Sequence, residues 1–281
     1  MPRILILTDS TNDLPAEWIR QYDIRVIPTY VHFDMESLAD DGVQLTRSDF
    51  YTRLAASSIL PTTAAPSVGE VLTVMEKALQ DADQVVAITA AASLSGLYNT
   101  FRLAAEQTAP DRVTLIDSRM TSMGMGWQVL TAAEMAQAGA STEEIKARML
   151  DIQPRSHVWA ALDTMEYLRR SGRVSWAAAM VGGLFQIKPL IHLHDGSVGS
   201  AARVRTSHRA FETLVEIAHQ AAPLERLAVL HTQNMAGARQ LLDALVDIRP
   251  DSAVPIVDVT PVIGVHVGPN GLGLGVVQKN R

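Results

Sequence analysis

The chain has 281 residues, of which 47% are hydrophobic and 19% charged, so it can bury a sizeable core and is not of the disordered class. Its net charge of −6 argues against a nucleic acid or an anionic membrane surface as the main partner. The lack of cysteine excludes disulfides and thiolate metal sites, and no run approaches the ~20 apolar residues of a membrane helix. We therefore expect a cytoplasmic protein without stable membrane insertion.

Four short apolar runs in the first half predict strands, at residues 4–7, 25–27, 84–89 and 113–116. Because these runs alternate with helical patterns, we expect a mainly parallel sheet with right-handed crossovers. In such sheets, ligands bind beyond the carboxyl ends of the strands. Polar residues gather at those ends, at 8–11, 89–95 and 117–118. Their convergence on one edge of the sheet predicts a binding site there.

The central turn of this half, residues 90–99, joins strand 84–89 to a helix over residues 97–108. Ser93 and Ser95 stand where N-cap residues belong, and Gly96 allows a ligand to approach the backbone closely. The free N–H groups and partial positive charge of a helix N-terminus can hold an anion. The alternative is that one of the serines only caps the helix.

Three further helix starts have the spacing of a capping box, in which a glutamate three residues along completes the cap. The pairs are Ser67 with Glu70, Ser141 with Glu144, and Asp163 with Glu166, and the last pair opens a short helix that ends at Gly172. Residues 34–62 are expected to be irregular apart from a helix near residues 47–57.

The pattern changes near residue 154, so we divide the chain into domains 1–154 and 155–281. In the second domain we expect strands at 157–162, 226–231 and 254–259, helices at 207–222 and 235–248, and a glycine-rich tail at 262–278. A hairpin of 189–194 with 198–203 is indicated by Asp195-Gly196. The fold class is therefore α/β, with an N-terminal parallel-sheet α/β domain and a C-terminal α+β domain with an antiparallel sheet.

One segment of the second domain, residues 174–186, is apolar nearly all round. Such a pattern predicts a helix that is buried or that lines an apolar cavity, because no face of it is suited to water.

Several other motifs have weak support. The glycines at 271, 273 and 275 resemble a dinucleotide fingerprint, but no helix follows them. His192 and His194 share one strand face, but no third ligand is evident, so we expect a surface hairpin and no metal site. Asp9 and Asp117 are interpreted as turn and cap residues rather than cation ligands.

Several motifs recur along the whole chain in a characteristic order. They are Thr8-Asp9-Ser10-Thr11, Pro61-Thr62-Thr63, Leu94-Ser95-Gly96-Leu97-Tyr98, Ser171-Gly172-Arg173-Val174, Ile187-Lys188-Pro189-Leu190, Val204-Arg205-Thr206 and the glycines from Gly264 to Gly275. With these motifs the chain resembles the DegV family, bacterial fatty-acid-binding proteins that serve fatty acid kinase. The chain departs from the family at Ala91-Ala92, where Ser-Ser is usual, and at Ala64-Ala65, where Ser-Gln is usual.

The resemblance implies a long-chain fatty acid held between the two domains, with its tail buried and its carboxylate near the central turn. A separate fatty acid kinase then phosphorylates the carboxylate, so this chain is not itself expected to be an enzyme and needs no cofactor. The expected fatty-acid-binding residues are Thr62, Thr63, Ser93, Leu94, Ser95, Gly96, Arg170 and His266. Among them, Ser93, Thr62 and Thr63 are expected to substitute for the hydroxyls that are missing at Ala91-Ala92 and Ala64-Ala65. The resemblance also carries over Arg173 and Arg205 as residues that dock the kinase.

Two other functions remain open alongside fatty acid binding by a monomer. The first is a serine esterase or hydrolase that acts on acyl substrates through Ser93 or Ser95 with His266 as base, although no acid is evident to orient the histidine. The second is a sensor module for another small anion. A co-purified long-chain acid would favour the binding protein, and turnover of a chromogenic acyl ester would favour the esterase.

Overall fold

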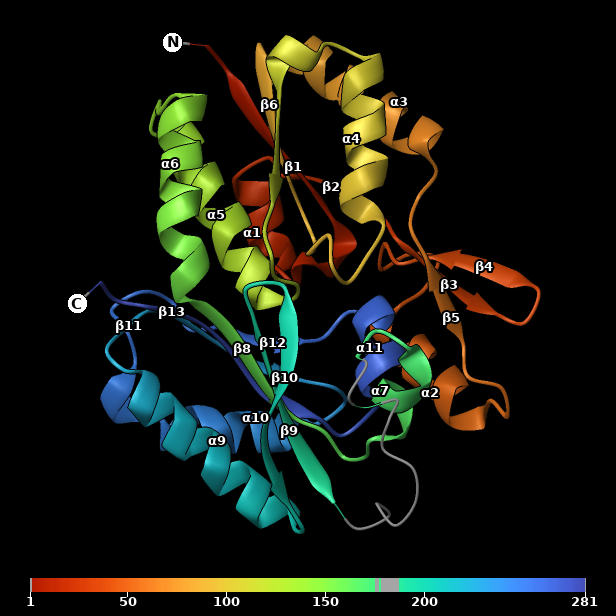
Figure 1. The fold of residues 1–281 in the computed structure, drawn as a ribbon, viewed down its shortest axis with the longest axis vertical. Coiled ribbons are helices and arrows are strands. Elements are labelled where there is room, and N and C mark those ends of the chain that lie inside the picture. Colours follow the sequence, from red (N-terminus) through yellow and green to blue (C-terminus); the bar gives the residue numbers. More distant parts are fainter. Residues whose placement is uncertain (1, 175–176, 178–186, 281) are drawn as a thin grey trace.

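The computed structural model describes residues 2–174, 177 and 187–280 and contains two main sheets, one in each half of the chain. In Figure 1 the first sheet occupies the upper part of the molecule and the second sheet the lower part. Both termini lie on the same side of this view.

The first sheet is fully parallel and has the order β2-β1-β6-β7. Its strands are β1 (Ile4–Asp9), β2 (Arg25–Ile27), β6 (Gln84–Thr89) and β7 (Val113–Asp117). All four strands are those predicted from the apolar runs. Because the strands are parallel, the polar turns after β1, β6 and β7 lie at one edge, as expected.

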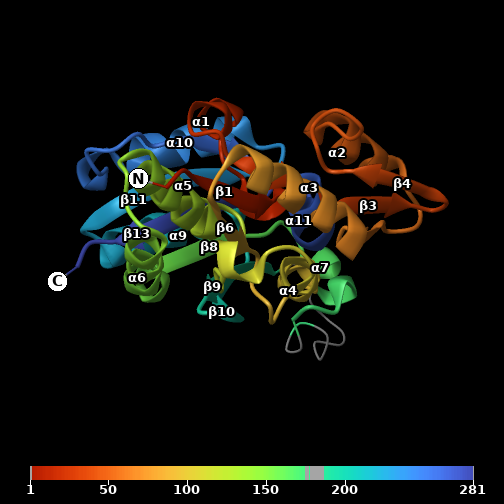
Figure 2. The ribbon, with the colours of Figure 1, turned by 90° about the horizontal axis from the view of Figure 1, so that it is seen from above.

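Helices cover both faces of this sheet. They are α1 (Ala16–Gln21), α3 (Val68–Asp81), α4 (Leu97–Gln107), α5 (Met123–Gln137) and α6 (Thr142–Ile152). Helices α3 and α4 lie on one side, and α1, α5 and α6 on the other (Figures 1 and 2). The capping boxes at Ser67 and Ser141 are both present, which confirms these two predicted helix starts.

A small antiparallel sheet interrupts the first half between β2 and α3. It comprises β3 (Tyr30–Phe33), β4 (Glu36–Ala39) and β5 (Thr62–Ala64) in the order β4-β3-β5. Helix α2 (Arg47–Ala56) connects β4 to β5 in the sequence and shares a hydrophobic cluster with β3. Helix α2 was predicted, but the strands were not, because three or four residues are too few to show an alternating pattern.

The second sheet has the order β10-β9-β8-β13-β11-β12. Its strands are β8 (Ser156–Ala161), β9 (Lys188–His194), β10 (Ser197–Val204), β11 (Leu224–His231), β12 (Ile256–Asp258) and β13 (Leu272–Gln278). The hairpin of β9 and β10 turns at Asp195 and Gly196, as predicted. Helices α9 (Ser207–Ala221) and α10 (Met235–Ala244) pack on one face of this sheet.

The glycine-rich tail was not recognised as regular structure. It forms α11 (Pro261–Val267) and then β13, which lies in the middle of the second sheet between β8 and β11. A Cβ on Gly275 would approach Cβ of Met123 to 2.7 Å, and one on Gly273 would approach the Trp159 carbonyl oxygen to 2.7 Å. Glycine is therefore required for close packing here, and it removes the side-chain pattern by which a strand is recognised.

Two predictions near residue 170 have different outcomes. Helix α7 (Glu166–Ser171) ends at Gly172 in the left-handed conformation, as expected. The predicted capping box is wrong, because the Thr164 hydroxyl accepts the Glu166 amide and the Asp163 carboxylate pairs with Lys188. The apolar helix predicted at 174–186 lies outside the described residues, except for Val174 and Ala177, which are both buried.

One hydrophobic core runs through both halves of the chain. Helix α5 contacts β1 on one side and β13 on the other, and its residues 123–133 are all buried. Trp127 within it donates from Nε1 to the Gly275 carbonyl oxygen at 2.9 Å. Among the described helices, none combines the length and the apolar character that crossing a bilayer requires.

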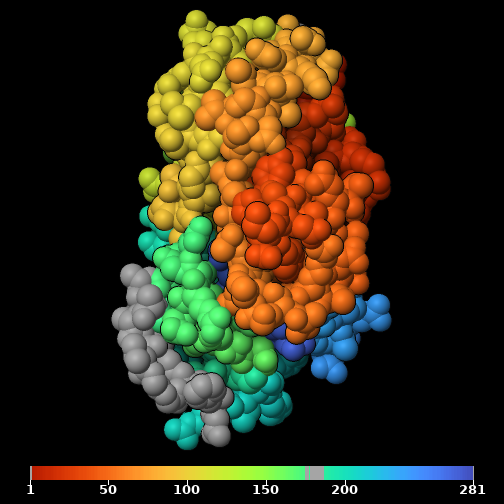
Figure 3. Space-filling view, turned by 90° about the vertical axis from the view of Figure 1, so that its right-hand side faces the viewer, coloured from red at the N-terminus to blue at the C-terminus, as the bar shows by residue number. Residues whose placement is uncertain are grey.

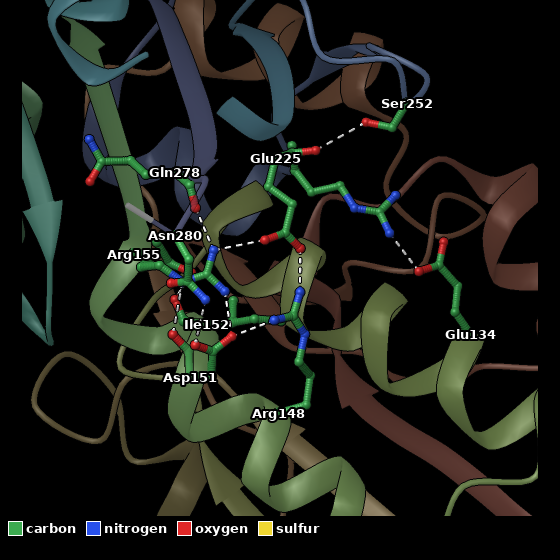
Figure 4. A network of polar contacts seen from close by, with 11 residues as sticks. Glu134, Arg148, Asp151, Ile152, Arg155, Glu225, Ser252, Gln278 and Asn280 are labelled. Atoms are coloured by element: carbon green, nitrogen blue, oxygen red, sulfur yellow. Dashed lines mark hydrogen bonds and ion pairs between the residues drawn. The ribbon is translucent and has the colours of Figure 1, made fainter. Parts of the chain in front are cut away.

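An ion-pair network also joins the halves, as Figure 4 shows. The Arg155 guanidinium, whose side chain is only 11% exposed, contacts Asp151 at 2.5 Å and Glu225 at 2.7 Å. It also donates to the backbone carbonyl of Gln278. Arg148 from α6 pairs with the same two carboxylates, so α6 is connected to β11 and β13.

Candidate functional site

A cavity of about 550 Å³ lies between the carboxyl edge of the first sheet and one face of the second sheet. The wall formed by the second sheet is apolar, and its residues include Val158, Ala160, Ile191, Leu193, Val198 and Leu230. These residues point to the cavity because alternate side chains of a strand face opposite sides of its sheet. The neighbours of the cavity-facing residues on β8, such as Trp159 and Ala161, pack against α9 instead.

The opposite wall is polar and is formed mainly by turns of the first half. Its hydroxyl-bearing residues include Thr11, Thr29, Thr63, Ser93, Ser95, Thr121 and Ser122. Two of the turns are braced by the buried Asp9 carboxylate, which accepts the Thr11 amide at 2.9 Å and the Ala90 amide at 2.9 Å. Burial raises the pKa of Asp9. Asp117 similarly accepts the Arg119 amide, so both aspartates act as turn residues, as interpreted from the sequence.

The central turn differs in detail from the expectation. The N-cap of α4 is Gly96 and has no side-chain cap, while Ser95 Oγ accepts the Leu97 amide at 3.3 Å. Ser93 Oγ donates to the Gly196 carbonyl at 2.5 Å, which attaches this turn to the hairpin of the second sheet. The amides of residues 94 and 95 both donate to the Ala91 carbonyl, so they are not free to bind an anion.

His266 enters the cavity wall from α11 and lies beside Thr63 of β5. Its Nε2 is 3.3 Å from Thr63 Oγ1, and its Nδ1 is buried without a hydrogen-bond partner among the described residues. Burial, with a smaller contribution from the positive charge of Arg173, lowers the pKa of His266 to about 4. The imidazole is therefore neutral at pH 7 and retains one N–H that can donate.

The cavity brings together most of the sequence-predicted residues. Its lining contains Thr63, Ser93, Leu94, Ser95, Gly96 and His266. Thr62 and Arg170 are outside the lining: Thr62 is exposed at the start of β5, and the Arg170 guanidinium pairs with Glu166. Arg173, assigned from the sequence to partner docking, is exposed but also lines the cavity, and it is the one arginine or lysine in the described lining. Arg205 is exposed after β10 and does not line the cavity.

Other lining residues were not assigned to the binding site from the sequence. Thr29, His231 and Thr232 belong to segments that show no site motif, so only the assembled fold reveals them. Thr11, Thr121 and Ser122 follow β1 and β7, and the polar ends of those strands were the available signal.

Two buried carboxylates lie behind the polar wall and connect the two halves. Asp13 accepts the Thr260 amide at 2.8 Å and the Ser122 hydroxyl at 2.5 Å. Asp40 accepts the Thr260 hydroxyl at 2.6 Å. Burial raises the pKa of Asp13 to about 7 and that of Asp40 to about 6.

The arrangement does not favour an esterase. The nearest recorded side-chain partner of His266 is Thr63 rather than a serine, and no carboxylate contacts its Nδ1 among the described residues. The Ser93 hydroxyl is directed to a backbone carbonyl. A nucleophile, base and orienting acid are thus not in hydrogen-bond sequence.

Comparisons with known proteins agree along the whole chain. The sequence profile described as "Uncharacterised protein, DegV family" matches residues 3–279. A DegV domain-containing protein from Deinococcus radiodurans is 33% identical over 279 residues, covering 96% of this chain and 97% of that protein. A solved structure described as "Fatty Acid Binding of a DegV family Protein from Thermus thermophilus" has a TM-score of 0.90 at 29% identity and covers 98% of this chain and 99% of its own. The structure of "DegV, a fatty acid binding protein from Bacillus subtilis" has a TM-score of 0.85 at 27% identity and covers 99% of this chain and 100% of its own.

Proposed function

This chain belongs to the DegV family, and on that premise we propose that it binds a long-chain fatty acid in the cavity between its two sheets. The observation that carries the proposal is the division of the cavity into an apolar wall on the second sheet and a polar wall on the turns of the first half. The relatives from Thermus thermophilus and Bacillus subtilis, described as fatty-acid-binding, support it.

The acyl tail would lie along the apolar wall. Burying 16 carbons at ~0.8 kcal/mol per CH₂ contributes on the order of 12 kcal/mol before entropy costs are subtracted. The volume of about 550 Å³ lies within the range of roughly 300–1,000 Å³ that is usual for small-molecule sites.

The carboxylate would lie at the polar wall, where hydroxyl and imidazole donors are available. Thr63 and His266 contact each other there, and Ser95 Oγ, which accepts the Leu97 amide, still has its own proton to donate. Arg173 supplies a positive charge at the same wall. Charge-assisted hydrogen bonds from such groups to a carboxylate are about twice as strong as neutral ones.

Native mass spectrometry of protein purified without added ligand tests this function. We expect one bound molecule per chain with the mass of a long-chain fatty acid, which organic extraction removes and added palmitate restores. A chain that carries no acid and takes up none after extraction would contradict the proposal. Release of product from a chromogenic acyl ester would favour the hydrolase instead.

We also propose that the bound acid is presented to a fatty acid kinase. Arg173 and Arg205 are both exposed, and they are positive points on a protein of net charge −6. Charges of this kind steer the approach of a complementary partner and affect the association rate more than the final affinity. Figure 3 shows the face on which α7, the helix just before Arg173, reaches the surface beside the segment that contains α2.

A further inference from the structure

A second group of side chains lies on the face of the second sheet opposite to the cavity. His157 of β8 and His192 and His194 of β9 each present one ring nitrogen, and these nitrogens lie within 4.8 Å of one another. Val158 and Leu193, which alternate with them, line the cavity. The third histidine, which was not evident from the sequence, comes from the neighbouring strand, where Trp159 is directly opposite His192 in the register.

The protonation of two rings follows from their hydrogen-bond partners. Gln278 donates from Nε2 to the Ala221 carbonyl at 3.0 Å, so its Oε1 is the atom that faces His157 Nε2 at 3.2 Å. An amide oxygen only accepts, and therefore His157 Nε2 carries the proton and Nδ1 has a free lone pair. Likewise His194 Nδ1 lies 3.0 Å from the Ser156 carbonyl and must donate, which leaves Nε2 with a lone pair.

The remaining contact joins the two strands. His157 Nδ1 and His192 Nε2 are 3.0 Å apart, so His192 donates to the lone pair of His157. Two nitrogens bound to one tetrahedral zinc ion at 2.0–2.1 Å would be separated by a similar distance, roughly 3.3 Å. Moving the His192 proton to Nδ1 would leave three imidazole lone pairs on nitrogens that lie within 4.8 Å of one another.

We propose that His157, His192 and His194 bind a divalent transition metal ion of the zinc type, with water completing the coordination. Imidazole is a preferred ligand for zinc, nickel and copper. Histidines that bind metals usually donate their other ring N–H to a carbonyl or carboxylate, which fixes the ring. Gln278 and the Ser156 carbonyl already occupy that position for two of the three rings. Figure 4 shows the Gln278 side chain extending away from the Arg155 network, which contacts only its backbone carbonyl.

The rings must turn to close on an ion. They are stacked, with interplanar angles of 27° between His157 and His192 and 6° between His192 and His194. The χ2 torsion of histidine is broad, so the torsion itself opposes this rotation only weakly. Trp159 stacks on His157 at 4.9 Å and on His192 at 4.8 Å between ring centroids, so its fluorescence reports on any change in the cluster.

The test uses the full chain, without a polyhistidine tag and dialysed against a chelator. We expect calorimetric titration with ZnCl₂ to show one site per chain. Titration with CuCl₂ should quench tryptophan fluorescence in proportion to the fraction of chains that have bound copper. His192→Gln and His157→Gln should each weaken zinc binding at least 100-fold, while Gln278→Leu should weaken it about 10- to 100-fold. Trp159→Phe should retain zinc binding and lose most of the quenching.

The control is His208→Ala, because His208 is 84% exposed on α9 and is not a member of the cluster. It should leave both titrations unchanged. Circular dichroism and thermal melting of each variant separate loss of the site from loss of the fold, and His194→Gln serves if another variant does not fold. A stoichiometry near zero, or an equal loss in His208→Ala and His192→Gln, would overturn the proposal. Fatty acid content, measured in parallel, is expected to be the same in all variants.

Discussion

The contribution of His266 to fatty acid affinity can be worked out from its surroundings. The ring is largely buried and neutral at pH 7. Among the described residues, its Nε2 has Thr63 Oγ1 as a hydrogen-bond partner and its Nδ1 has none. A bound carboxylate would provide the missing partner. A hydrogen bond to a charged group contributes about 1.5–3 kcal/mol, so we expect His266→Leu to raise the Kd for palmitate about 10- to 150-fold.

Displacement of a fluorescent fatty acid from delipidated protein measures this effect. Hexadecanol, which has the same tail and no carboxylate, separates the two ends of the ligand: its affinity should change little in His266→Leu. Thr63→Val and Thr62→Val form a matched pair, since Thr63 lines the cavity and Thr62 does not. Only the Thr63 variant should weaken palmitate binding. The reasoning would be refuted if the Kd of His266→Leu for palmitate stayed within twofold of the original value, or if its affinity for hexadecanol fell by the same factor as its affinity for palmitate.

Three further predictions concern other parts of the molecule. Because the pKa of Asp13 is raised to about 7, the folded state holds its proton more tightly than the unfolded state, so the free energy of unfolding falls as pH rises from about 4 through 7. Urea unfolding of Asp13→Asn at a series of pH values should lack this contribution. If the pH profiles of the variant and the original protein are parallel, the prediction is wrong. Arg155→Met should lower the free energy of unfolding by on the order of 2–3 kcal/mol, because it removes the largely buried guanidinium that pairs with both Asp151 and Glu225 and donates to the Gln278 carbonyl. An unchanged urea midpoint would exclude this. Arg205→Gln should leave palmitate affinity unchanged but reduce acyl phosphate formation with the cognate kinase. Arg170→Gln, which removes only an ion pair with Glu166 on the same helix, should not reduce acyl phosphate formation. Full acyl phosphate formation with Arg205→Gln would show that Arg205 does not dock the kinase.

The strands and helices that carry local patterns could be predicted from the sequence. Residues 84–89 form a continuous apolar run, and Ser67 and Ser141 have the spacing of a capping box. In each case the residues that cause the structure are close together in the sequence. Strand β13 could not be predicted in this way, because its glycines are dictated by Met123 and Trp159, which are distant in the chain. Short-range patterns therefore indicate the elements, whereas close approaches between elements are fixed only by the assembled fold.

The candidate site shows the same limit. The polar ends of β1, β6 and β7 predicted which edge of the sheet would face the cavity. Which arginine faces it depends on the turn at Gly172, whose positive φ of 67° redirects the chain after α7. Arg170, before that turn, pairs along its own helix, and Arg173, after it, lines the cavity. The division at residue 154 stays a prediction, since one core crosses it.

The position of α5 has a consequence for synthesis on the ribosome. Residues 123–133 are covered on one side by β1, which is made first, and on the other by β13, which is made almost last. At about 5–20 residues per second, the nascent chain carries this apolar helix on the order of ten seconds before its second cover exists. Chaperones have that interval in which to bind it. A message cut short before the codons for β13 would yield a product with the helix left open, and such a product would be degraded or would aggregate rather than persist as a functional half.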